Sequence, residues 1–509
     1  MSTVNRIIKN SGYLYIRIGI TTFLSLYTTR LVLDALGTTD FGIYNLVGGV
    51  IAMLGFLNAA MAQATQRFMS YNEGKGDLEE KRRIFNVSLL LHIGIAILLS
   101  LLLIILGCYF FNYVLNIPYN RLNSSIVVYM CLIISTALGV INVPYDAILN
   151  AHENMFYYSL VGIIDAILRL TIAFSLSIIK NDRLLVYGIL MSCIPILMFI
   201  IVRIYCHKHY DECYISLKKY FDKKLAKEMS SFAGWSFLPN IANVIVVQGS
   251  SIVLNRFGGV LINAAHGIAN QLAGYLLVFS SNMQKALNPV IVKKEGESNR
   301  NQMVAYSMSG TKYSFLLFAF FAIPFYQEMP YILHFWLKNP PEYSVIFCRL
   351  IILRRLFGQI TVSFTTAIGA TGKIKQNSII NFIIMVVSLP TSVIIYYMNA
   401  PIYSIYIVML VMVILTSCSN IYFMHCQCGM DYSKYIKEVL LPCFIVLVIT
   451  YSVSYISSSF WEESFVRLLI VCCLSIITFC FSSYYWALNN QEKNMMKLLI
   501  INICRKIFK

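Results

Sequence analysis

The stretch RLVLDALGTTDFGIYNLVGGVIAMLGFLNAAMAQATQRFMSYNEGKGD, residues 30–77, runs from one apolar segment into the next through residues 37–40 alone. So short a connection leaves no space for a folded domain between the two segments. Segments of this kind fill the chain, in which 58% of the residues are hydrophobic and only 12% are charged. A soluble protein of 509 residues needs a far more polar surface. We therefore expect an all-α, polytopic membrane protein.

We expect about 14 transmembrane helices, several of them longer than the roughly 20 residues that a bilayer requires. The first twelve are expected at 12–36, 41–70, 84–115, 123–149, 155–179, 184–205, 230–257, 261–292, 304–333, 343–372, 377–398 and 402–426. Two further helices follow at 439–456 and 465–488. The first ten residues are polar, and the apolar stretch behind them is too long for a signal peptide, so we expect the first helix to remain in the membrane.

An internal repeat relates the two halves of the chain. Gly12 and Gly234 open corresponding helices 222 residues apart, Gly74 and Gly296 end corresponding helices at the same offset, and Gly37 matches Gly258 at an offset of 221. The two copies lie six helices apart and so share one orientation, which predicts two parallel six-helix bundles plus two C-terminal helices. The expected division is 1–205 for the first bundle, 206–229 for a cytoplasmic linker, 230–426 for the second bundle, and 427–509 for the last two helices and a tail.

Charge in the loops predicts the orientation. Lysine and arginine gather in alternate loops, and the positive-inside rule then places both termini in the cytoplasm. This distribution explains the net charge of +17 without a nucleic-acid partner. Between residues 214 and 229, apolar residues such as Leu217 and Phe221 alternate with five lysines. That pattern predicts an amphipathic helix on the inner leaflet, with a solvated basic linker as the alternative.

Basic residues inside the expected helices are the main functional signal. An unpaired charge near the bilayer centre costs at least about 2.5 kcal/mol. Arg17 and Arg30 lie in the first helix, Arg354 and Arg355 in the tenth, and Lys285 near one end of the eighth. A guanidinium stays charged and binds phosphate oxygens in pairs, so we predict that these side chains bind an anionic substrate. Lys285, like Lys312 in the ninth helix, has the alternative of reaching the headgroups of the inner leaflet.

Few acids lie within the helices, and we interpret Asp34, Asp146 and Asp165 as candidates for coupling transport to protons or sodium ions. The alternative is a static ion pair, because Asp34 is four residues from Arg30 and Asp165 is four residues from Arg169.

Three polar residues of the eighth helix, His266, Asn270 and Gln271, either meet sugar hydroxyls or form hydrogen bonds across helices. The one tight group of metal-ligand types, His425 with Cys426 and Cys428, lacks a fourth ligand nearby. We therefore expect no metal and no cofactor. The sequence also has no P-loop, which argues against direct use of ATP.

Residues 30–77 and the later stretch LNRFGGVLINAAHGIANQLAGYLLVFSSNMQKALNPVIVKKEGE, residues 254–297, resemble the Wzx-type oligosaccharide flippases of bacterial surface polysaccharide synthesis. These proteins belong to the superfamily that also contains lipid II flippases and MATE drug exporters. The resemblance covers essentially the whole chain, although its motifs are diffuse.

The resemblance implies two bundles around a central cationic cavity and transport by alternating access. The implied substrate is an undecaprenyl-diphosphate-linked oligosaccharide, moved from the inner to the outer leaflet of the bacterial inner membrane, with the polysaccharide polymerase machinery as a further implied partner. It also implies that arginines of the first helix, here Arg17 and Arg30, engage the diphosphate, and that the last two helices offer a groove for the lipid tail.

Two other classes of protein are alternatives. A MATE-like exporter of organic cations usually has twelve helices and an acidic cavity, whereas this chain is expected to have about 14 helices and a basic one. A membrane-embedded polysaccharide polymerase or glycosyltransferase needs a large outer loop or paired outer acids. The outer loops here are short, with one acidic pair at Glu462 and Glu463. We therefore expect a transporter and not an enzyme.

Overall fold

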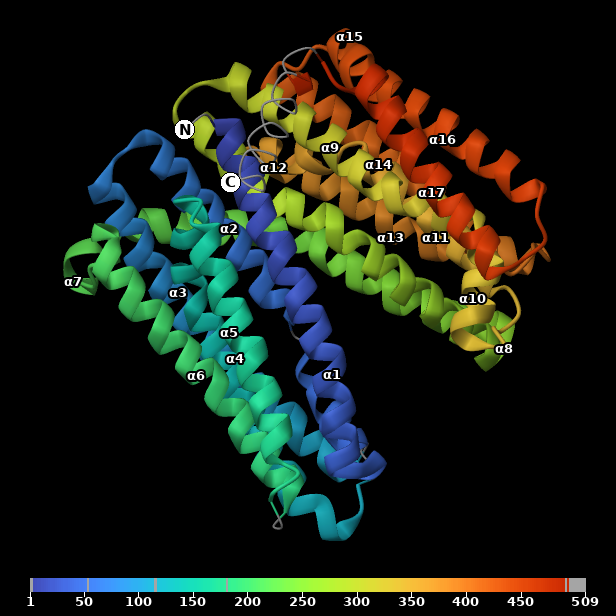
Figure 1. Cartoon of the computed structure of the whole chain (residues 1–509). Coiled ribbons are helices and arrows are strands. Elements are labelled where there is room, and N and C mark those ends of the chain that lie inside the picture. Colours follow the sequence, from blue (N-terminus) through green and yellow to red (C-terminus); the bar gives the residue numbers. More distant parts are fainter. Residues whose placement is uncertain (1–2, 53–54, 114–116, 180–181, 490–491, 494–509) are drawn as a thin grey trace, which may run out of the picture. The chain divides into compact units, whose positions relative to one another are not determined.

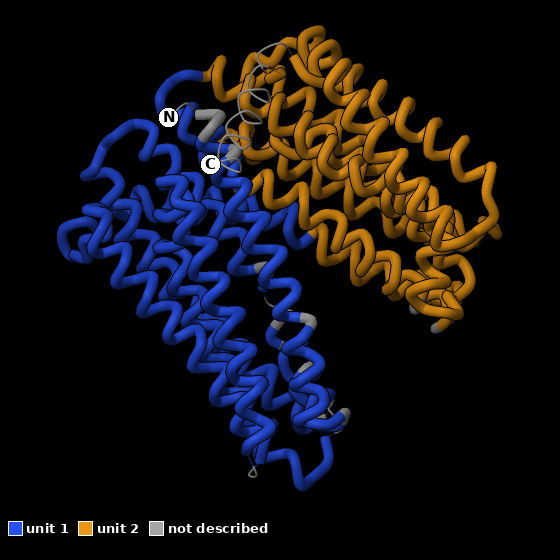
Figure 2. The backbone as a smooth tube through the Cα atoms, in the orientation of Figure 1, with its two compact units in different colours: residues 1–241, 286–299 blue, residues 242–285, 300–509 orange. Residues whose placement is uncertain are grey.

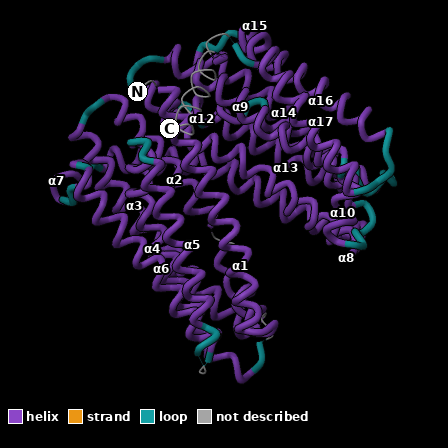
Figure 3. Tube along the Cα trace, viewed as in Figure 1, coloured by secondary structure: helices purple, strands orange, loops and turns teal. Residues whose placement is uncertain are grey.

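The structure is a computed structural model that describes residues 3–52, 55–113, 117–179, 182–489 and 492–493. These residues form helices joined by short loops, without strands, which confirms the all-α fold class (Figures 1 and 3). The α-helices are α1 (Thr3–Ala52), α2 (Gly55–Lys75), α3 (Leu78–Tyr113), α4 (Leu122–Ala151), α5 (Met155–Ser175), α6 (Arg183–His209), α7 (Leu217–Tyr220), α8 (Lys223–Gly296), α9 (Arg300–Gln327), α10 (Met329–Leu337), α11 (Ser344–Gln359), α12 (Val362–Ala370), α13 (Lys375–Tyr397), α14 (Ser404–Cys428), α15 (Tyr432–Tyr435), α16 (Leu441–Ser459) and α17 (Phe465–Ser482). Short 3-10 turns η1 (Tyr119–Arg121) and η2 (Asp211–Cys213) and π-helical turns η3 (Ile436–Leu440) and η4 (Ser483–Ala487) complete the order.

Two glycines each join a pair of expected membrane helices without a loop. Gly37 interrupts α1 with φ 74° and ψ 171°, and Gly259 interrupts α8 with φ 79° and ψ −175°. Only glycine adopts this backbone conformation readily, because it has no Cβ. The first and second membrane helices therefore lie within α1 and α2, and the seventh and eighth lie within α8. The match predicted between Gly37 and Gly258 is wrong by one residue, since Gly259 makes the equivalent break, at the offset of 222 seen elsewhere.

Ten helical stretches in the described residues are long and apolar enough to cross a membrane. The helical stretches 3–36 and 260–296 do not meet this test, and α11 and α12, into which the tenth expected helix is divided, are too short for it. These helices carry Arg17, Arg30, Lys285, Arg354 and Arg355. Polar residues in a transmembrane helix normally face a protein interior or a water-filled cavity, so these segments are suited to line a substrate path.

The linker before α8 differs from the prediction of one amphipathic helix. It consists of η2, the single-turn α7 and the first residues of α8, with a break at Phe221 and Asp222. The Asp222 side chain explains the break, because it caps α8 by accepting hydrogen bonds from the backbone amides of Lys224 at 2.8 Å and Leu225 at 3.1 Å.

The chain forms two compact units, coloured in Figure 2. Unit 1 contains residues 1–241 and 286–299, and unit 2 contains residues 242–285 and 300–509. Helix α8 thus runs from unit 1 into unit 2 and back into unit 1. The bundle boundaries expected at 205, 229 and 426 stay a prediction.

Small residues allow close packing of helices in each unit. In unit 1 a Cβ at Gly188 of α6 would lie 2.6 Å from Val128 of α4, and a Cβ at Gly107 of α3 would lie 2.3 Å from the Tyr129 ring. In unit 2 a Cβ at Gly249 would lie 2.4 Å from Leu389 of α13. Membrane helices associate through such contacts, since lipid provides no hydrophobic drive between them.

Candidate functional site

Arg17 is held against α5 in unit 1. Its guanidinium carbon lies 4.7 Å from the centre of the Tyr158 ring, and a Cβ on Gly162 would lie 2.4 Å from its Nε. That Nε is buried and has no hydrogen-bond partner in the described part of the chain. The ring stabilises the cation but does not neutralise it, so the charge remains available to an anion.

Arg30 and Asp34 are both exposed on α1. Within the described residues they form no ion pair with each other, so the predicted alternative of a static pair is not what the structure contains. Charged side chains of a membrane helix avoid lipid. The exposed face of α1 that bears them is therefore suited to a water-filled space.

The second predicted pair is present. Asp165 accepts hydrogen bonds from Arg169 at 2.7 Å and 3.2 Å on the same helix, α5. This pairing leaves Asp165 less suited to exchange ions than Asp34. Asp146 is half-buried on α4.

In unit 2, α8, α11 and α14 bring polar residues together. His266 Nδ1 lies 2.6 Å from the Tyr406 hydroxyl, and the Asn270 amide nitrogen lies 3.0 Å from Nε2. The Tyr406 hydroxyl and the Asn270 amide therefore lie at opposite nitrogens of the His266 ring. Of the two roles predicted for His266, the structure contains the hydrogen bond across helices. Gln271 is exposed and donates to Tyr275 at 3.3 Å.

Sequence reasoning missed Tyr406, which is 1% exposed. A tyrosine in an apolar segment gave no signal of its own, because its partner His266 lies 140 residues away in sequence.

Arg354 is a buried charge of unit 2 that has no acidic partner in the described residues. It is 9% exposed, and its Nη1 donates to the Met409 sulfur at 3.1 Å. No carboxylate in the described residues lies within ion-pair distance of Arg354 or of the adjacent Arg355. Arg355 Nε is also buried without a hydrogen-bond partner. Arg354 interacts electrostatically with His266 and Tyr406, so its charge lies beside their polar group.

Two other buried cations in the described residues of unit 2 have carboxylate partners. Arg467 contacts the Glu328 carboxylate at 3.0 Å and 3.1 Å. Lys312 contacts Glu492 at 2.8 Å, and the alternative that it reaches the headgroups stays a prediction. Lys285 is half-buried on α8.

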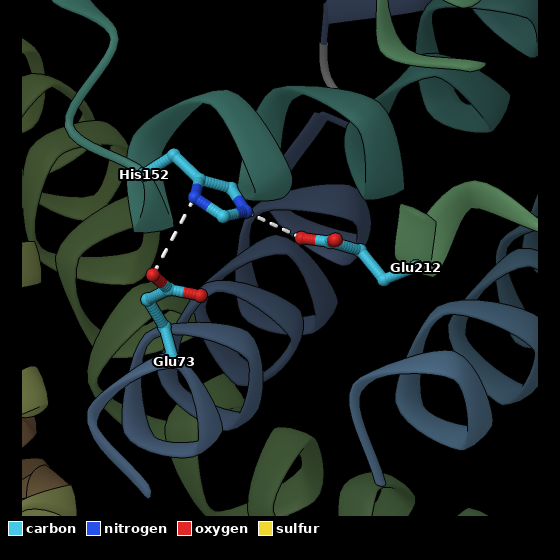
Figure 4. Close-up of side chains that lie close together, drawn as sticks. All are labelled: Glu73, His152 and Glu212. Carbon is cyan, nitrogen blue, oxygen red and sulfur yellow. Dashed lines mark hydrogen bonds and ion pairs between the residues drawn. The ribbon is translucent and has the colours of Figure 1, made fainter. Parts of the chain in front are cut away.

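A further charged cluster of unit 1, outside the membrane helices, was also missed from the sequence. Figure 4 shows Glu73 facing one ring nitrogen of His152 and Glu212 facing the other. The distances are 3.4 Å from Nδ1 to Glu73 and 2.5 Å from Nε2 to Glu212. In the described residues this is the one group whose ligand atoms converge as a metal site would require. The two carboxylates face opposite nitrogens of the ring, whereas a metal ion would take one nitrogen and both carboxylates on the same side. The predicted trio at His425 does not converge in this way.

Two family models match the chain. A family model described as polysaccharide biosynthesis protein matches residues 7–295, and the MatE model matches residues 236–394. No curated protein matches the chain.

Solved structures share the fold at low identity. A crystal structure of a MATE protein in the bent conformation is 14% identical, with a TM-score of 0.71 over 84% of this chain and 96% of that chain. A multidrug resistance MATE family transporter of the MOP superfamily, in an outward-facing conformation, is also 14% identical, with a TM-score of 0.70 over 84% and 96%. A MOP superfamily transporter from Pyrococcus furiosus, described by the reverse polarity of its binding pocket, is 15% identical, with a TM-score of 0.69 over 84% and 96%.

The polysaccharide biosynthesis model covers more than half of the chain, and the fold is that of the MATE transporters. These findings confirm the resemblance to Wzx-type flippases: the chain is a multi-pass membrane protein of the MATE/MOP superfamily and belongs to the polysaccharide biosynthesis protein family.

Proposed function

We propose that this protein flips undecaprenyl-diphosphate-linked oligosaccharide from the inner to the outer leaflet of a bacterial inner membrane, by alternating access. The observation that carries the proposal is Arg354, a buried guanidinium whose polar contact is a methionine sulfur and not a carboxylate. An uncompensated buried charge destabilises a protein, so its presence is best explained by an anionic ligand. A diphosphate supplies the paired oxygens that a guanidinium binds best.

Arg17 and Arg355 support the same proposal, because each has a buried Nε without a hydrogen-bond partner in the described residues. Arg30 and Lys285 complete the proposed set of cations for the diphosphate. Asn270 and Gln271 are proposed to meet the sugars. The chemistry required is binding and movement of a lipid, without bond breaking, which agrees with a transporter family rather than an enzyme.

We propose that a proton or sodium gradient drives the cycle and that Asp34 is the coupling group. Asp34 is exposed on α1, whereas Asp165 is engaged by Arg169. Asp146 is the second candidate. Export from cells in which either gradient is collapsed distinguishes the two ions.

The alternative is export of organic cations, since one structural relative is a multidrug resistance transporter. Arg354 argues against this function here, because a cation placed beside it would be repelled.

The test is to delete the gene and extract lipid-linked intermediates. We expect complete undecaprenyl-diphosphate oligosaccharide to accumulate on the cytoplasmic leaflet. Complete units that reach the outer leaflet without polymerising would instead indicate a membrane enzyme, and unchanged intermediates would favour the cation exporter. A reporter fused after Lys509, beyond the described residues, tests the proposed orientation and should give a cytoplasmic signal.

A further inference from the structure

The C-terminal ends of α2 and α8 lie in direct backbone contact within unit 1. A Cβ on Gly74 would lie 2.1 Å from the carbonyl oxygen of Lys293, and a Cβ on Gly296 would lie 1.9 Å from that of Tyr71. No other residue type fits at either position, because backbone and not a flexible side chain fills the space. Gly74 and Gly296 are also the repeat-related glycines found in the sequence.

Ion pairs surround this crossing. Glu73, the residue before Gly74, contacts Lys81 of α3 at 2.8 Å, His152 at 3.4 Å and Lys293 of α8 at 3.5 Å. His152 links Glu73 to Glu212 of η2. One network therefore joins the end of α8 to α2, α3, the corner after α4 and the segment after α6.

Two opposing effects set the pKa of Glu212 in this network. Burial alone would raise it, but the hydrogen bond and charge of His152, together with Lys81, lower it below its ordinary value. The carboxylate is thus held ionised beside a positive partner.

Two kinds of contact follow one another along this end of α8. Apolar side chains pack the part before the crossing, where Ala286, Leu287, Val290, Ile291 and Val292 are buried. At the crossing itself glycines meet, and ion pairs that water reaches in part lie beside them: the Glu73 side chain is 14% exposed and that of His152 is 23% exposed, while that of Glu212 is 3% exposed. Partly hydrated ion pairs exchange protein partners for water at small net cost, unlike buried apolar side chains.

Helix α8 also has a weak point where it enters this contact. It passes from unit 2 to unit 1 between Lys285 and Ala286, and Pro289 lies one turn beyond. Proline has no amide hydrogen, so the helical hydrogen bond to the Lys285 carbonyl is missing. The end of α8 can therefore change direction relative to the rest of the helix at this place.

We propose that Gly74, Gly296 and the ion-pair network of Glu73, His152, Glu212, Lys81 and Lys293 form a reversible latch. The latch fastens the end of α8 to α2, α3 and the turn after α4, and it releases that end once in each transport cycle. This inference rests on one part of the proposed function, the alternation between conformations during transport. It adds which contact must open in that alternation.

The first test closes the latch permanently. Lys75 and Glu297 are exposed, and Glu297 follows the glycine of the crossing. A chain with Lys75→Cys and Glu297→Cys is treated with a short bismaleimide, and each single substitution serves as the matched control. We expect export to fall at least tenfold in the crosslinked double variant and to stay normal in both controls. Normal export by a fully crosslinked chain would show that the contact is static and would overturn the proposal.

The second test weakens the latch and follows hydrogen exchange of the purified protein, which requires no substrate. We expect Glu73→Gln to speed exchange in residues 288–299 by about tenfold, equivalent to about 1.4 kcal/mol. The control is Glu80→Gln, which removes the same charge from a more exposed pair with Arg83 on α3. It should leave hydrogen exchange in residues 288–299 unchanged. Equal exchange in both variants would contradict the latch. Slower exchange of the wild type on adding Zn²⁺ would also overturn it, since the cluster would then be a metal site.

Gly74→Ala provides a variant without a change of charge. It should speed hydrogen exchange in residues 288–299. Gly94→Ala on α3, where a Cβ meets nothing within 4 Å, should leave that exchange unchanged. Because exchange reports the contact directly, a latch that opens in these tests while lipid-linked intermediates stay normal would refute the proposed substrate and not the latch.

Discussion

Replacing Arg354 by methionine separates function from stability. For a residue that only supports the fold, loss of activity and loss of stability go together. Arg354 is buried, its Nη1 contacts the Met409 sulfur, and the described residues supply no carboxylate for it. A methionine of similar length removes the charge and keeps the packing. We therefore expect Arg354→Met to abolish export while making the folded protein more stable.

The magnitude follows from the cost of burying charge. Replacing buried ionic groups by apolar side chains of similar volume stabilises proteins by about 1–4 kcal/mol even when the charges are paired. Arg354 has no such pair, so we expect a gain of at least about 1 kcal/mol in the free energy of unfolding. The gain should be measured without substrate, because bound diphosphate would stabilise the arginine form by mass action.

Arg467 is the matched control. It is as buried as Arg354 but contacts Glu328, which is fully buried. Arg467→Met leaves that carboxylate without its partner and should destabilise the protein by about 3–5 kcal/mol.

The assay combines thermal unfolding of purified protein with export in cells, corrected for the amount of protein. An Arg354→Met protein that is less stable than wild type, and whose export falls only in proportion to its amount, would refute the reasoning. Arg354 would then be a structural residue.

Three further predictions follow from the geometry of unit 1. Gly162→Ala places a Cβ 2.4 Å from Arg17 Nε, and the flexible arginine side chain should move away from it. We expect the free energy of unfolding to change by less than about 1 kcal/mol while export falls severalfold. Normal export would remove Arg17 from the site. Asp165→Asn leaves Arg169 without its partner on the candidate membrane helix α5, where an unpaired charge costs at least about 2.5 kcal/mol. We therefore expect less folded protein but export within twofold of wild type once it is corrected for the amount of protein; a complete loss of corrected export would make Asp165 the coupling group. Glu212 has a pKa below its ordinary value of 4.5, so its contribution to stability is full above that pH and is lost as the pH falls through the lowered pKa. Glu212→Gln should therefore be less stable than wild type at pH 7, and this difference should shrink when unfolding is measured toward pH 4. A difference that stays constant with pH would exclude the ionised pair.

The sequence was sufficient for the fold because its signals are local. Apolar segments, their lengths and the glycine repeat predicted a helical protein with two related halves, and the structure and family comparison confirm the class. The ion pair between Asp165 and Arg169 was predicted for the same reason, since four residues on a helix fix the distance. Errors arose where one residue decides the backbone, as in the break at Gly259 and the cap at Asp222.

The site was predicted only in part because its contacts are not local. Arg354 is recognisable in the sequence as a charge without an acid on its own helix. Its neighbour Tyr406 is not, since the pairing with His266 depends on how two distant helices pack. The cluster of Glu73, His152 and Glu212 is likewise assembled from three separate helix ends, and no spacing in the sequence indicates it.

The low apolarity of the helical stretches 3–36 and 260–296 has a consequence for how the protein is made. Insertion of a nascent helix into lipid from the translocon depends on its summed apolarity, and each arginine near the centre opposes insertion by about 2.5–3.5 kcal/mol. The segments 3–36 and 260–296 should therefore not enter the bilayer alone and should wait for later, more apolar helices. Helix α3, with a mean hydropathy of 3.0, is the most apolar of the ten candidate helices in the described residues. Stable insertion of the helix that carries Arg17 and Arg30 should thus depend on α3 entering the membrane after it.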